Sequence, residues 1–289
     1  MSRRALTLFV FLLAGIASAA SQERSGGILQ GYPLSADNSQ QWKLPDKLNE
    51  ISGLAVTEDA RLLAVTDEVA IVYELDYSGG RLVKAFALGD PVIRGDFEGI
   101  AYFDGRVWLV TSDAVIYAFE EGQDGERVAF DRHDTGLGRF CEFEGLVYRR
   151  QDEALLLPCK GVKRGSGLGG LAIFAWSTAS NEVLEEKRMA LPDRDIAAAI
   201  RSGRFSPSGI AIAEQSGNLL IVAARERSII ELDAAGNFLS AKVLPPASHR
   251  QAEGIGILPT GELLIADEGG AHKARLAMYR PARCDACNR

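Results

Sequence analysis

Five short stretches of the sequence place a polar residue directly before a glycine that opens an apolar run. They read ISGLAV, FEGIAY, FEGLVY, PSGIAI and AEGIGI. The polar residues are Ser52, Glu98, Glu144, Ser208 and Glu253. Carboxylate and hydroxyl oxygens are hard donors, and calcium accepts about six to eight of them in a loose geometry. The pattern therefore indicates a hard-cation site, provided that the fold brings these residues together.

A second column of polar residues stands two positions before the first. It comprises Glu50, Asp96, Glu142, Ser206 and Gln251. Apolar residues separate the columns, so in extended strands both columns share one face. The strands that follow end with Asp67, Asp113, Cys159 and Glu268, which we expect at the same place. Carboxylates that converge repel one another, and either a cation or raised pKa values must relieve the repulsion.

The type of ligand narrows the choice of metal. The columns before the glycines hold no histidine or cysteine, which disfavours zinc and copper and leaves calcium. The alternative is that the acids are solvated or pair with Arg139, Arg225 and Arg250. His133 and His249 precede first strands, so both are candidate general bases at the same place, although most surface histidines have no such role. The basic, glycine-rich residues 160–170 could hold an anion or form a plain flexible loop.

The repeat also predicts the fold. Its glycines, Gly53, Gly99, Gly145, Gly209 and Gly254, are 46, 46, 64 and 45 residues apart. Self-similarity at this period is typical of propellers and solenoids. Each unit holds four short apolar runs divided by turn residues, which predicts a four-stranded antiparallel blade whose first strand lines a central channel. We therefore expect an all-β, five-bladed β-propeller over residues 38–283.

Two details of the propeller can be predicted. The last unit has three strands, so residues 40–45 are expected to supply its outer strand and close the ring. The longest spacing, 64 residues between Gly145 and Gly209, is explained by the loop at 160–170 and by a short helix within residues 192–205, capped by Asp193.

The N-terminus has the order of a secretory signal. Arg3 and Arg4 precede an apolar stretch that ends in Ala-Ser-Ala at residues 17–19. We expect a signal peptide at 1–19, a linker at 20–37 and a periplasmic or secreted protein; a membrane anchor is the alternative. Without residues 1–19 the chain has 30 basic and 39 acidic residues, a net charge of about −9. This acidic balance disfavours nucleic acid as a partner, and no other segment resembles a transmembrane span.

Four cysteines, an even number, favour disulfides in an exported chain. Cys141 and Cys159 flank the first two strands of the third unit, which should pair antiparallel, so they are candidates for one disulfide. Cys284 and Cys287 form a CxxC pair in the C-terminal tail at 284–289, either as a small disulfide or as free thiols. No further zinc ligands lie near them.

The chain resembles the SdiA-regulated family of bacterial exported proteins. The resemblance covers about residues 40–280 and is carried by "LNEISGLAV", "LLAVTDE", "DFEGIAY", "EFEGLVY" and "NLLIVAARERSIIELDAAG". It implies a five-bladed propeller with a bound calcium ion, distantly similar to NHL-repeat propellers and calcium-dependent lactonases. In those propellers the residue before the strand glycine is a metal ligand, which by position implies Glu98, Glu144 and Glu253. Ser52 and Ser208 depart from an all-acid ring, and the resemblance implies no particular reaction.

The sequence thus favours an exported calcium-binding propeller with the metal at the channel mouth. It is expected to be a monomeric binding module for an unknown small molecule or envelope protein. One alternative is a calcium-dependent hydrolase that acts on a lactone, ester or phosphoester. Another is an interaction propeller in which the metal only stabilises the ring.

Overall fold

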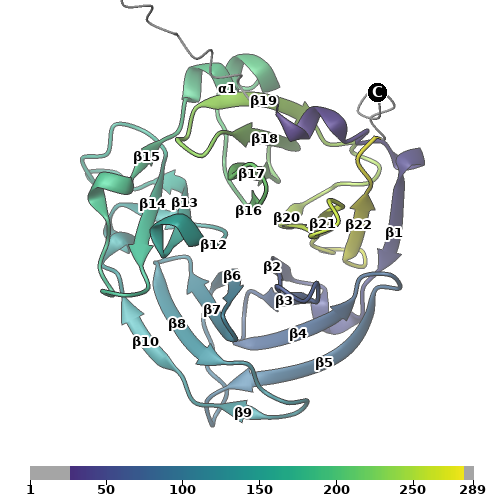
Figure 1. Cartoon of the computed structure of the whole chain (residues 1–289), viewed down its shortest axis with the longest axis vertical. Coiled ribbons are helices and arrows are strands. Elements are labelled where there is room, and N and C mark those ends of the chain that lie inside the picture. Colours follow the sequence, from purple (N-terminus) through teal and green to yellow (C-terminus); the bar gives the residue numbers. More distant parts are fainter. Residues whose placement is uncertain (1–26, 283–289) are drawn as a thin grey trace, which may run out of the picture.

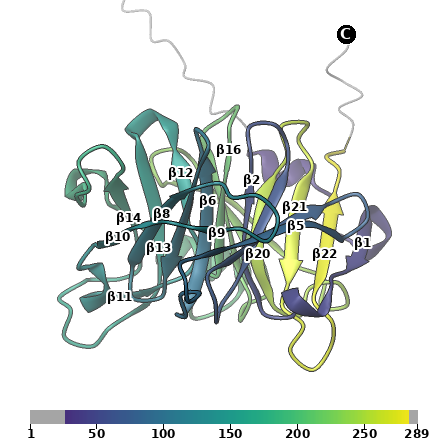
Figure 2. The ribbon, with the colours of Figure 1, turned by 90° about the horizontal axis from the view of Figure 1, so that it is seen from below.

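The computed structural model describes residues 27–282, which form five β-sheets arranged as blades around a central axis (Figure 1). Each blade runs from an inner first strand to an outer strand. The side view shows strands that cross a disc from one face to the other (Figure 2). The prediction of an all-β, five-bladed propeller is confirmed.

Blades one and two follow the repeat directly. Blade one contains β2 (Ile51–Val56), β3 (Leu62–Thr66), β4 (Ile71–Asp76) and β5 (Arg81–Leu88), with the short β9 (Arg127–Val128) parallel to β5. Blade two contains β6 (Phe97–Phe103), β7 (Arg106–Thr111), β8 (Val115–Glu120) and β10 (Asp131–Asp134).

In blade three the first strand is split. Its two parts, β11 (Cys141–Phe143) and β12 (Val147–Arg149), both pair with β13 (Ala154–Val162). Next come β14 (Ala172–Ser177) and β15 (Met189–Ala190). The helix α1 (Asp193–Ile200) follows and begins after Pro192 without a side-chain cap, so the predicted Asp193 cap is wrong. Cys141 and Cys159 form a disulfide, with their Cα atoms 5.6 Å apart.

Blades four and five complete the ring. Blade four contains β16 (Gly209–Ala213), β17 (Asn218–Ala223), β18 (Ser228–Leu232) and β19 (Phe238–Val243). Blade five contains β20 (Ala252–Ile257), β21 (Leu263–Asp267) and β22 (Arg275–Tyr279). Its outer strand is β1 (Ser39–Lys43), which pairs antiparallel with β22. The 3₁₀ helices are η1 (Ile28–Gly31), η2 (Ala36–Asn38), η3 (Asp46–Leu48), η4 (Leu137–Arg139), η5 (Arg150–Asp152) and η6 (Glu185–Lys187).

The segment before β1 is packed against the propeller, although the sequence suggested a linker there. Leu29 is fully buried, and the backbone N–H groups of Ile28 and Leu29 donate to the two carboxylate oxygens of Glu231 at 2.8 and 2.9 Å. The hydroxyl of Tyr32 donates to the carbonyl of Gly261. Residues 28–32 therefore join blades four and five. The predicted signal peptide, Cys284 and Cys287 lie outside the described residues.

The repeated glycines are explained by packing between blades. A Cβ atom on Gly99 would lie 2.6 Å from the backbone of Gly145, and one on Gly254 would lie 2.7 Å from the Leu54 side chain. No side chain fits where neighbouring first strands approach this closely. The residue after each glycine is aliphatic and buried: Leu54, Ile100, Leu146, Ile210 and Ile255.

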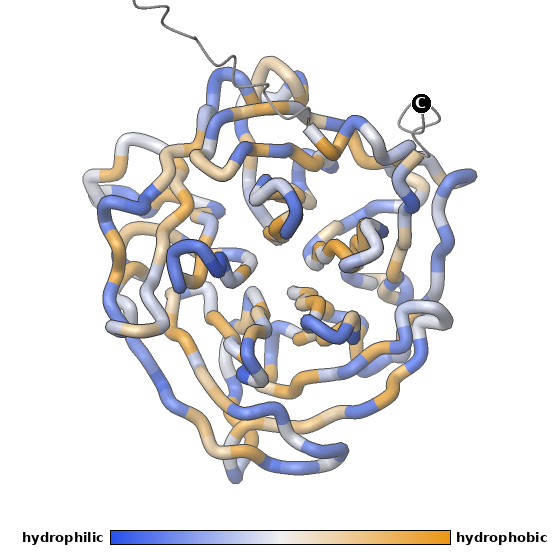
Figure 3. The backbone as a smooth tube through the Cα atoms, in the orientation of Figure 1, coloured by the Kyte–Doolittle hydropathy of each residue, from blue (hydrophilic) through white to orange (hydrophobic). Residues whose placement is uncertain are grey.

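The hydrophobic core consists of five clusters, each shared by adjacent blades. Hydrophobic residues follow the strands, and hydrophilic residues gather at turns and along the outer edge (Figure 3). No helix in residues 27–282 is long and apolar enough to cross a membrane.

Candidate functional site: a carboxylate mouth with one lysine

In blades one, two and five the residue before the repeated glycine is the extra residue of a β-bulge. In blade two, Phe97 lies opposite Thr111 and Gly99 lies opposite Val110, which leaves Glu98 unpaired. Ser52 and Glu253 hold the same position in blades one and five. A bulge bends the strand and redirects a side chain, so the repeat sends these side chains away from the regular pleat.

Blade three reaches the same result by a larger interruption. Its first strand is broken between β11 and β12, and Glu144 lies in this break. Gly145 adopts φ +94°, a left-handed value that favours glycine. Glu98, Glu144 and Glu253 therefore occupy equivalent positions where the first strands begin, on the face where the second strands end. We call this end of the channel the carboxylate mouth.

Burial and mutual repulsion perturb these glutamates. Burial raises the pKa of Glu98 to about 8; Asp96 and Glu253 add repulsion, and Lys160 opposes the shift. Burial likewise raises the pKa of Glu253 to about 7, again opposed by Lys160. The ammonium of Lys160 contacts Oε1 of Glu144, whose side chain is almost fully buried. Lys160 is thus the cation that all three glutamates share.

Sequence reasoning assigned Lys160 to a basic loop, but it lies within β13. Phe143 is opposite Cys159 in blade three, as Phe97 is opposite Thr111 in blade two. The mouth position is therefore the next residue of each second strand: Asp67, Ser112, Lys160 and Glu268. In the predicted column Asp67 and Glu268 are in register, whereas Asp113 lies one residue after the mouth position and Cys159 one residue before it. Aligning the runs LLAVT, WLVT, LLLPC and LLIAD would have revealed the lysine.

Asp113 and Cys159 accordingly have other roles. Asp113 is exposed in the turn after β7 and accepts a hydrogen bond from the hydroxyl of Thr111 at 2.5 Å. Cys159 is buried in the disulfide with Cys141. Placing either residue in the mouth column was wrong, because inter-strand register decides which residue ends there.

The two serines of the column hold the blades together. The Ser52 hydroxyl donates to the carbonyl of Phe97 at 2.7 Å, and the Ser208 hydroxyl donates to that of Ala252 at 2.6 Å. Each carbonyl belongs to the residue before a mouth glutamate. The Oγ of Ser208 also accepts from the backbone N–H of Ala224 at 3.0 Å. Both hydroxyl protons are therefore used by the backbone, and a metal-ligand role for these serines stays a prediction.

A second layer of polar residues surrounds the glutamates. Glu50, Asp96 and Glu142 are exposed, whereas Ser206 is buried and donates to Glu226. Ser112 donates to Asp96 at 2.5 Å, and Gln251 donates to Glu268. Burial and repulsion from Glu50 raise the pKa of Asp67 to about 6, and burial raises the pKa of Glu268. The rim of the mouth is therefore also acidic.

The two candidate general bases lie elsewhere. His133 belongs to the outer strand β10, where its ring lies 5.2 Å from that of Trp176, so its predicted place at the mouth is wrong. His249 is 1% exposed. Its Nδ1 lies 2.7 Å from Asp267 Oδ2 and its Nε2 lies 2.6 Å from the Tyr279 hydroxyl. Both ring nitrogens are occupied inside blade five and do not reach the solvent of the channel.

The arginine alternative has no support among the described ion pairs. None of those pairs within residues 27–282 uses Arg139, Arg225 or Arg250, and Arg139 lies over the ring of Phe140.

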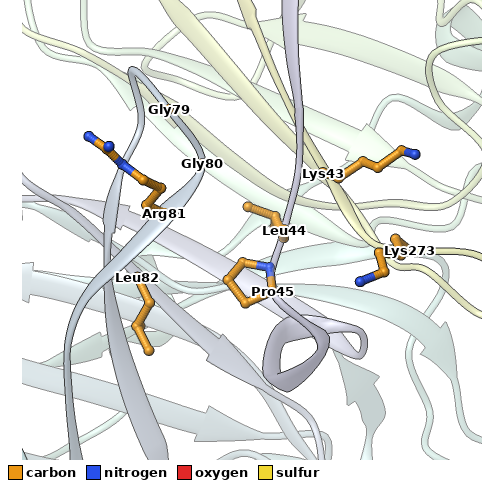
Figure 4. A pocket seen from close by; sticks show the side chains of 8 residues that line it. All are labelled: Lys43, Leu44, Pro45, Gly79, Gly80, Arg81, Leu82 and Lys273. Atoms are coloured by element: carbon orange, nitrogen blue, oxygen red, sulfur yellow. The ribbon is translucent and has the colours of Figure 1, made fainter.

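A separate basic hollow lies where β1 meets the turn between β4 and β5 (Figure 4). Its Arg81 and Lys273 are paired with Asp76 and Asp46. Two of the positive charges of this hollow are therefore paired with acids beside it.

The channel narrows sharply below the glutamates. At the level of the glycines it leaves a cavity of about 10 Å³, lined by Leu54, Ile100, Leu146, Ile210 and Ile255 among others. That is about the space of one water molecule. We call this constriction the aliphatic waist. It gives the carboxylates an apolar floor, consistent with the burial that raises their pKa values.

The donor atoms suit a hard cation, but their arrangement is not a formed metal cluster. Oε2 of Glu144 and Oδ1 of Asp67 are buried without a hydrogen-bond partner, and carboxylates outnumber the single lysine. Such oxygens favour calcium over softer metals. However, within residues 27–282 no three His, Cys, Asp or Glu side chains lie close enough to hold a metal together. Lys160 contacts Glu144 in the position where a cation would be expected.

The sequence matches the family model described as SdiA-regulated over residues 27–271. The chain belongs to the SdiA-regulated family. This SdiA-regulated propeller is similar in fold to the glutaminyl cyclase of Myxococcus xanthus, with 13% identity and a TM-score of 0.56 over 83% of this chain and 94% of that one. It is also similar to the PQQ-bound aldose sugar dehydrogenase of Streptomyces coelicolor, with 15% identity and a TM-score of 0.54 over 86% and 99% of the two chains.

These identities show a shared fold and carry no activity over to this SdiA-regulated protein. A comparison with curated protein sequences gives no significant match.

Proposed function

We propose that this protein is an exported binding module that takes up calcium at the carboxylate mouth. The observation that carries the proposal is the charge balance of the site. Glu98, Glu144 and Glu253 hold three carboxylates around the single ammonium of Lys160. When all are ionised, the excess is two negative charges, which one divalent cation would neutralise.

The glutamates would hold the ion through carboxylate oxygens, with the unpartnered Oε2 of Glu144 as the first candidate. Bound calcium supplies positive charge that lets buried carboxylates stay ionised. Protons and calcium therefore compete for Glu98 and Glu253, whose pKa values are about 8 and 7. Calcium affinity should rise with pH up to about pH 8, and binding near neutrality should release protons.

The test is a set of melting curves with calcium, magnesium or a chelator. At free calcium about a hundredfold above the dissociation constant, the gain in unfolding free energy is roughly 2.7 kcal/mol. Calcium should restore stability lost to chelator better than magnesium, which demands tighter octahedral geometry. Glu144→Gln should reduce the response, and Glu182→Gln, at an exposed turn, should not. A parent protein indifferent to all three additions would remove calcium from the proposal.

Export is part of the same proposal and rests on the Arg-apolar-small order of residues 1–19. The bound partner would be a small molecule or an envelope protein that meets the acidic rim. N-terminal sequencing of the natural protein should find a start near Ala20 in the periplasm or medium. Retention of Met1 on cytoplasmic protein would contradict export without bearing on the mouth.

A calcium-dependent hydrolase is the second candidate, and the perturbed glutamates favour it. A carboxyl group works best as a general acid or base when its pKa lies near the working pH. Glu98 and Glu253 meet this condition. In this role one would protonate the leaving oxygen of a lactone, ester or phosphoester while the other accepts a proton from water. A panel of such substrates tests it: activity should be lost in Glu98→Gln and kept in Glu182→Gln.

A further inference from the structure

The face opposite the carboxylate mouth holds a larger cavity, of about 630 Å³. It lies where the first strands end and is lined by residues from all five blades. The aliphatic waist separates it from the glutamates, because the waist leaves a space of only about 10 Å³. The two ends of the channel are therefore chemically independent. We call this second site the apolar cup.

The wall of the cup is built by the repeat itself. Three residues after each repeated glycine the lining residue is apolar or aromatic: Val56, Tyr102, Tyr148, Ile212 and Ile257. These side chains are neither fully buried nor at the surface, so each leaves part of an apolar surface facing the cavity. A ring of uncovered apolar side chains around a concavity is typical of a small-molecule site.

One side of the cup is aromatic and held in place. The ring of Phe103 stacks on that of Tyr148, with centroids 3.5 Å apart and planes 6° apart, and on Trp108 from the same blade. The opposite side is aliphatic, from Ile212 and Ile257. Stacked rings lose little further freedom when a ligand binds, which reduces the entropic cost of binding.

The rim of the cup carries few charges. Arg150 from blade three lies 3.7 Å from Glu58 of blade one, and Glu58 also accepts from the backbone N–H of Asp104. Glu214 of blade four adds a second acid. The rim thus has two carboxylates and one guanidinium that is already paired. This balance opposes an anionic ligand and offers polar contacts to an uncharged one.

We infer that the apolar cup binds an uncharged, mainly apolar small molecule with one polar end, such as a ring or acyl chain that carries a hydroxyl or amide. Its volume lies within the roughly 300–1,000 Å³ of small-molecule sites. The floor is closed and the walls come from five blades, so a flat protein surface could not reach the lining side chains. The apolar body would lie between Tyr148 and Ile212, and the polar end would meet Glu58 and Arg150.

The test uses the neutral dye N-phenyl-1-naphthylamine, whose emission rises in apolar surroundings. Titration of the full protein should give saturable binding of one dye molecule. Ile212→Glu places a charge on the wall and should weaken dye binding at least about tenfold, equivalent to about 1.4 kcal/mol. Val83→Glu is the control. Val83 is 56% exposed on the outer strand β5, so this substitution removes apolar surface outside the cup.

A second variant covers the case in which Ile212→Glu does not fold. Val56→Trp fills the cup while keeping it apolar, so it should also weaken dye binding, with cooperative melting retained. Equal dye binding in the parent and in every folded cup variant, or an equal loss in Val83→Glu, would overturn the inference. Calcium, chelator and Glu144→Gln should leave dye binding unchanged, so this test is independent of the proposed calcium site.

Discussion

The ammonium of Lys160 contacts Oε1 of Glu144 in the carboxylate mouth. The glutamate comes from the break in the first strand of blade three, and the lysine comes from the second strand of the same blade. The pair lies inside one blade, yet the lysine also lowers the pKa values of Glu98 and Glu253 from two other blades. One side chain therefore acts on glutamates from three blades, although burial still outweighs it at Glu98 and Glu253.

Lys160→Met should destabilise the protein in the absence of calcium. It leaves the buried carboxylate of Glu144 without a cation, and breaking such a pair costs about 3–5 kcal/mol when it is fully buried. Because Lys160 is partly exposed, we expect a smaller loss of about 2 kcal/mol in urea unfolding. The double variant Lys160→Met with Glu144→Leu should recover most of it. A similar loss in Lys163→Met, on an exposed residue nearby, would show that the effect is unspecific.

The mouth should make stability depend on pH. The folded-state pKa values of Glu98 and Glu253, about 8 and 7, lie above the ordinary value of 4.5. At a pH between the ordinary and the folded-state pKa, each glutamate binds more protons in the folded protein than in the unfolded chain. The free energy of unfolding should therefore fall as pH rises from about 4.5 to 8. Denaturant unfolding with chelator at several pH values measures this slope. Glu98→Gln should flatten it, and a slope that Glu98→Gln leaves unchanged would assign the effect to other groups.

Gly99→Ala should disturb the contact between blades two and three. The new Cβ would lie 2.6 Å from the backbone of Gly145, which cannot move aside as a flexible side chain could. Overpacking of this kind typically costs about 1–3 kcal/mol. Gly31→Ala is the matched control, since a Cβ there meets nothing within 4 Å. Thermal unfolding of both variants gives the comparison, and equal melting temperatures would contradict the packing explanation for the repeated glycines.

Glu231→Leu should release the N-terminal segment from blade four. The fully buried carboxylate accepts from the backbone N–H groups of Ile28 and Leu29 and from the side chains of Asn218 and Ser240. Hydrogen bonds to a charged group contribute about 1.5–3 kcal/mol each when one partner is lost. Hydrogen exchange should speed up at Ile28 and Leu29 while the strands of blades one to three stay protected. Unchanged exchange at these two amides would show that the carboxylate does not hold the segment.

The fold could be predicted from the sequence because it depends on a local pattern. The period of the glycines sets the blades, and the four apolar runs in each unit set the strands. Lys160 was missed for a physical reason. In blade two the unpaired residue, Glu98, lies on the first strand, whereas in blade three the unpaired residue between Cys159 and Gly161 is Lys160, on the second strand. Which residue reaches the mouth therefore depends on pairing between strands.

Contacts between distant segments were also beyond sequence reasoning. Ile28 and Glu231 are 203 residues apart, and nothing near Ile28 indicates that a buried carboxylate will receive its N–H. The hydrogen bonds of His249 to Asp267 and Tyr279 depend likewise on how the second and third strands of blade five pair. From residue types alone, His249 was predicted as a candidate general base, because its two hydrogen-bond partners are not visible in the sequence.

The five equivalent positions before the glycines are divided between two tasks. Ser52 and Ser208, in blades one and four, join their strands to the next blade, whereas blades two, three and five carry glutamates. A ring of five identical residues would look the same after each turn of 72°, and a bound molecule could settle in any of five equivalent orientations. Here the serines are not adjacent, and within residues 27–282 the lysine that contacts a mouth glutamate lies in blade three, so no rotation superposes the ring on itself. A molecule that binds at this end of the propeller would therefore have one preferred orientation about the axis.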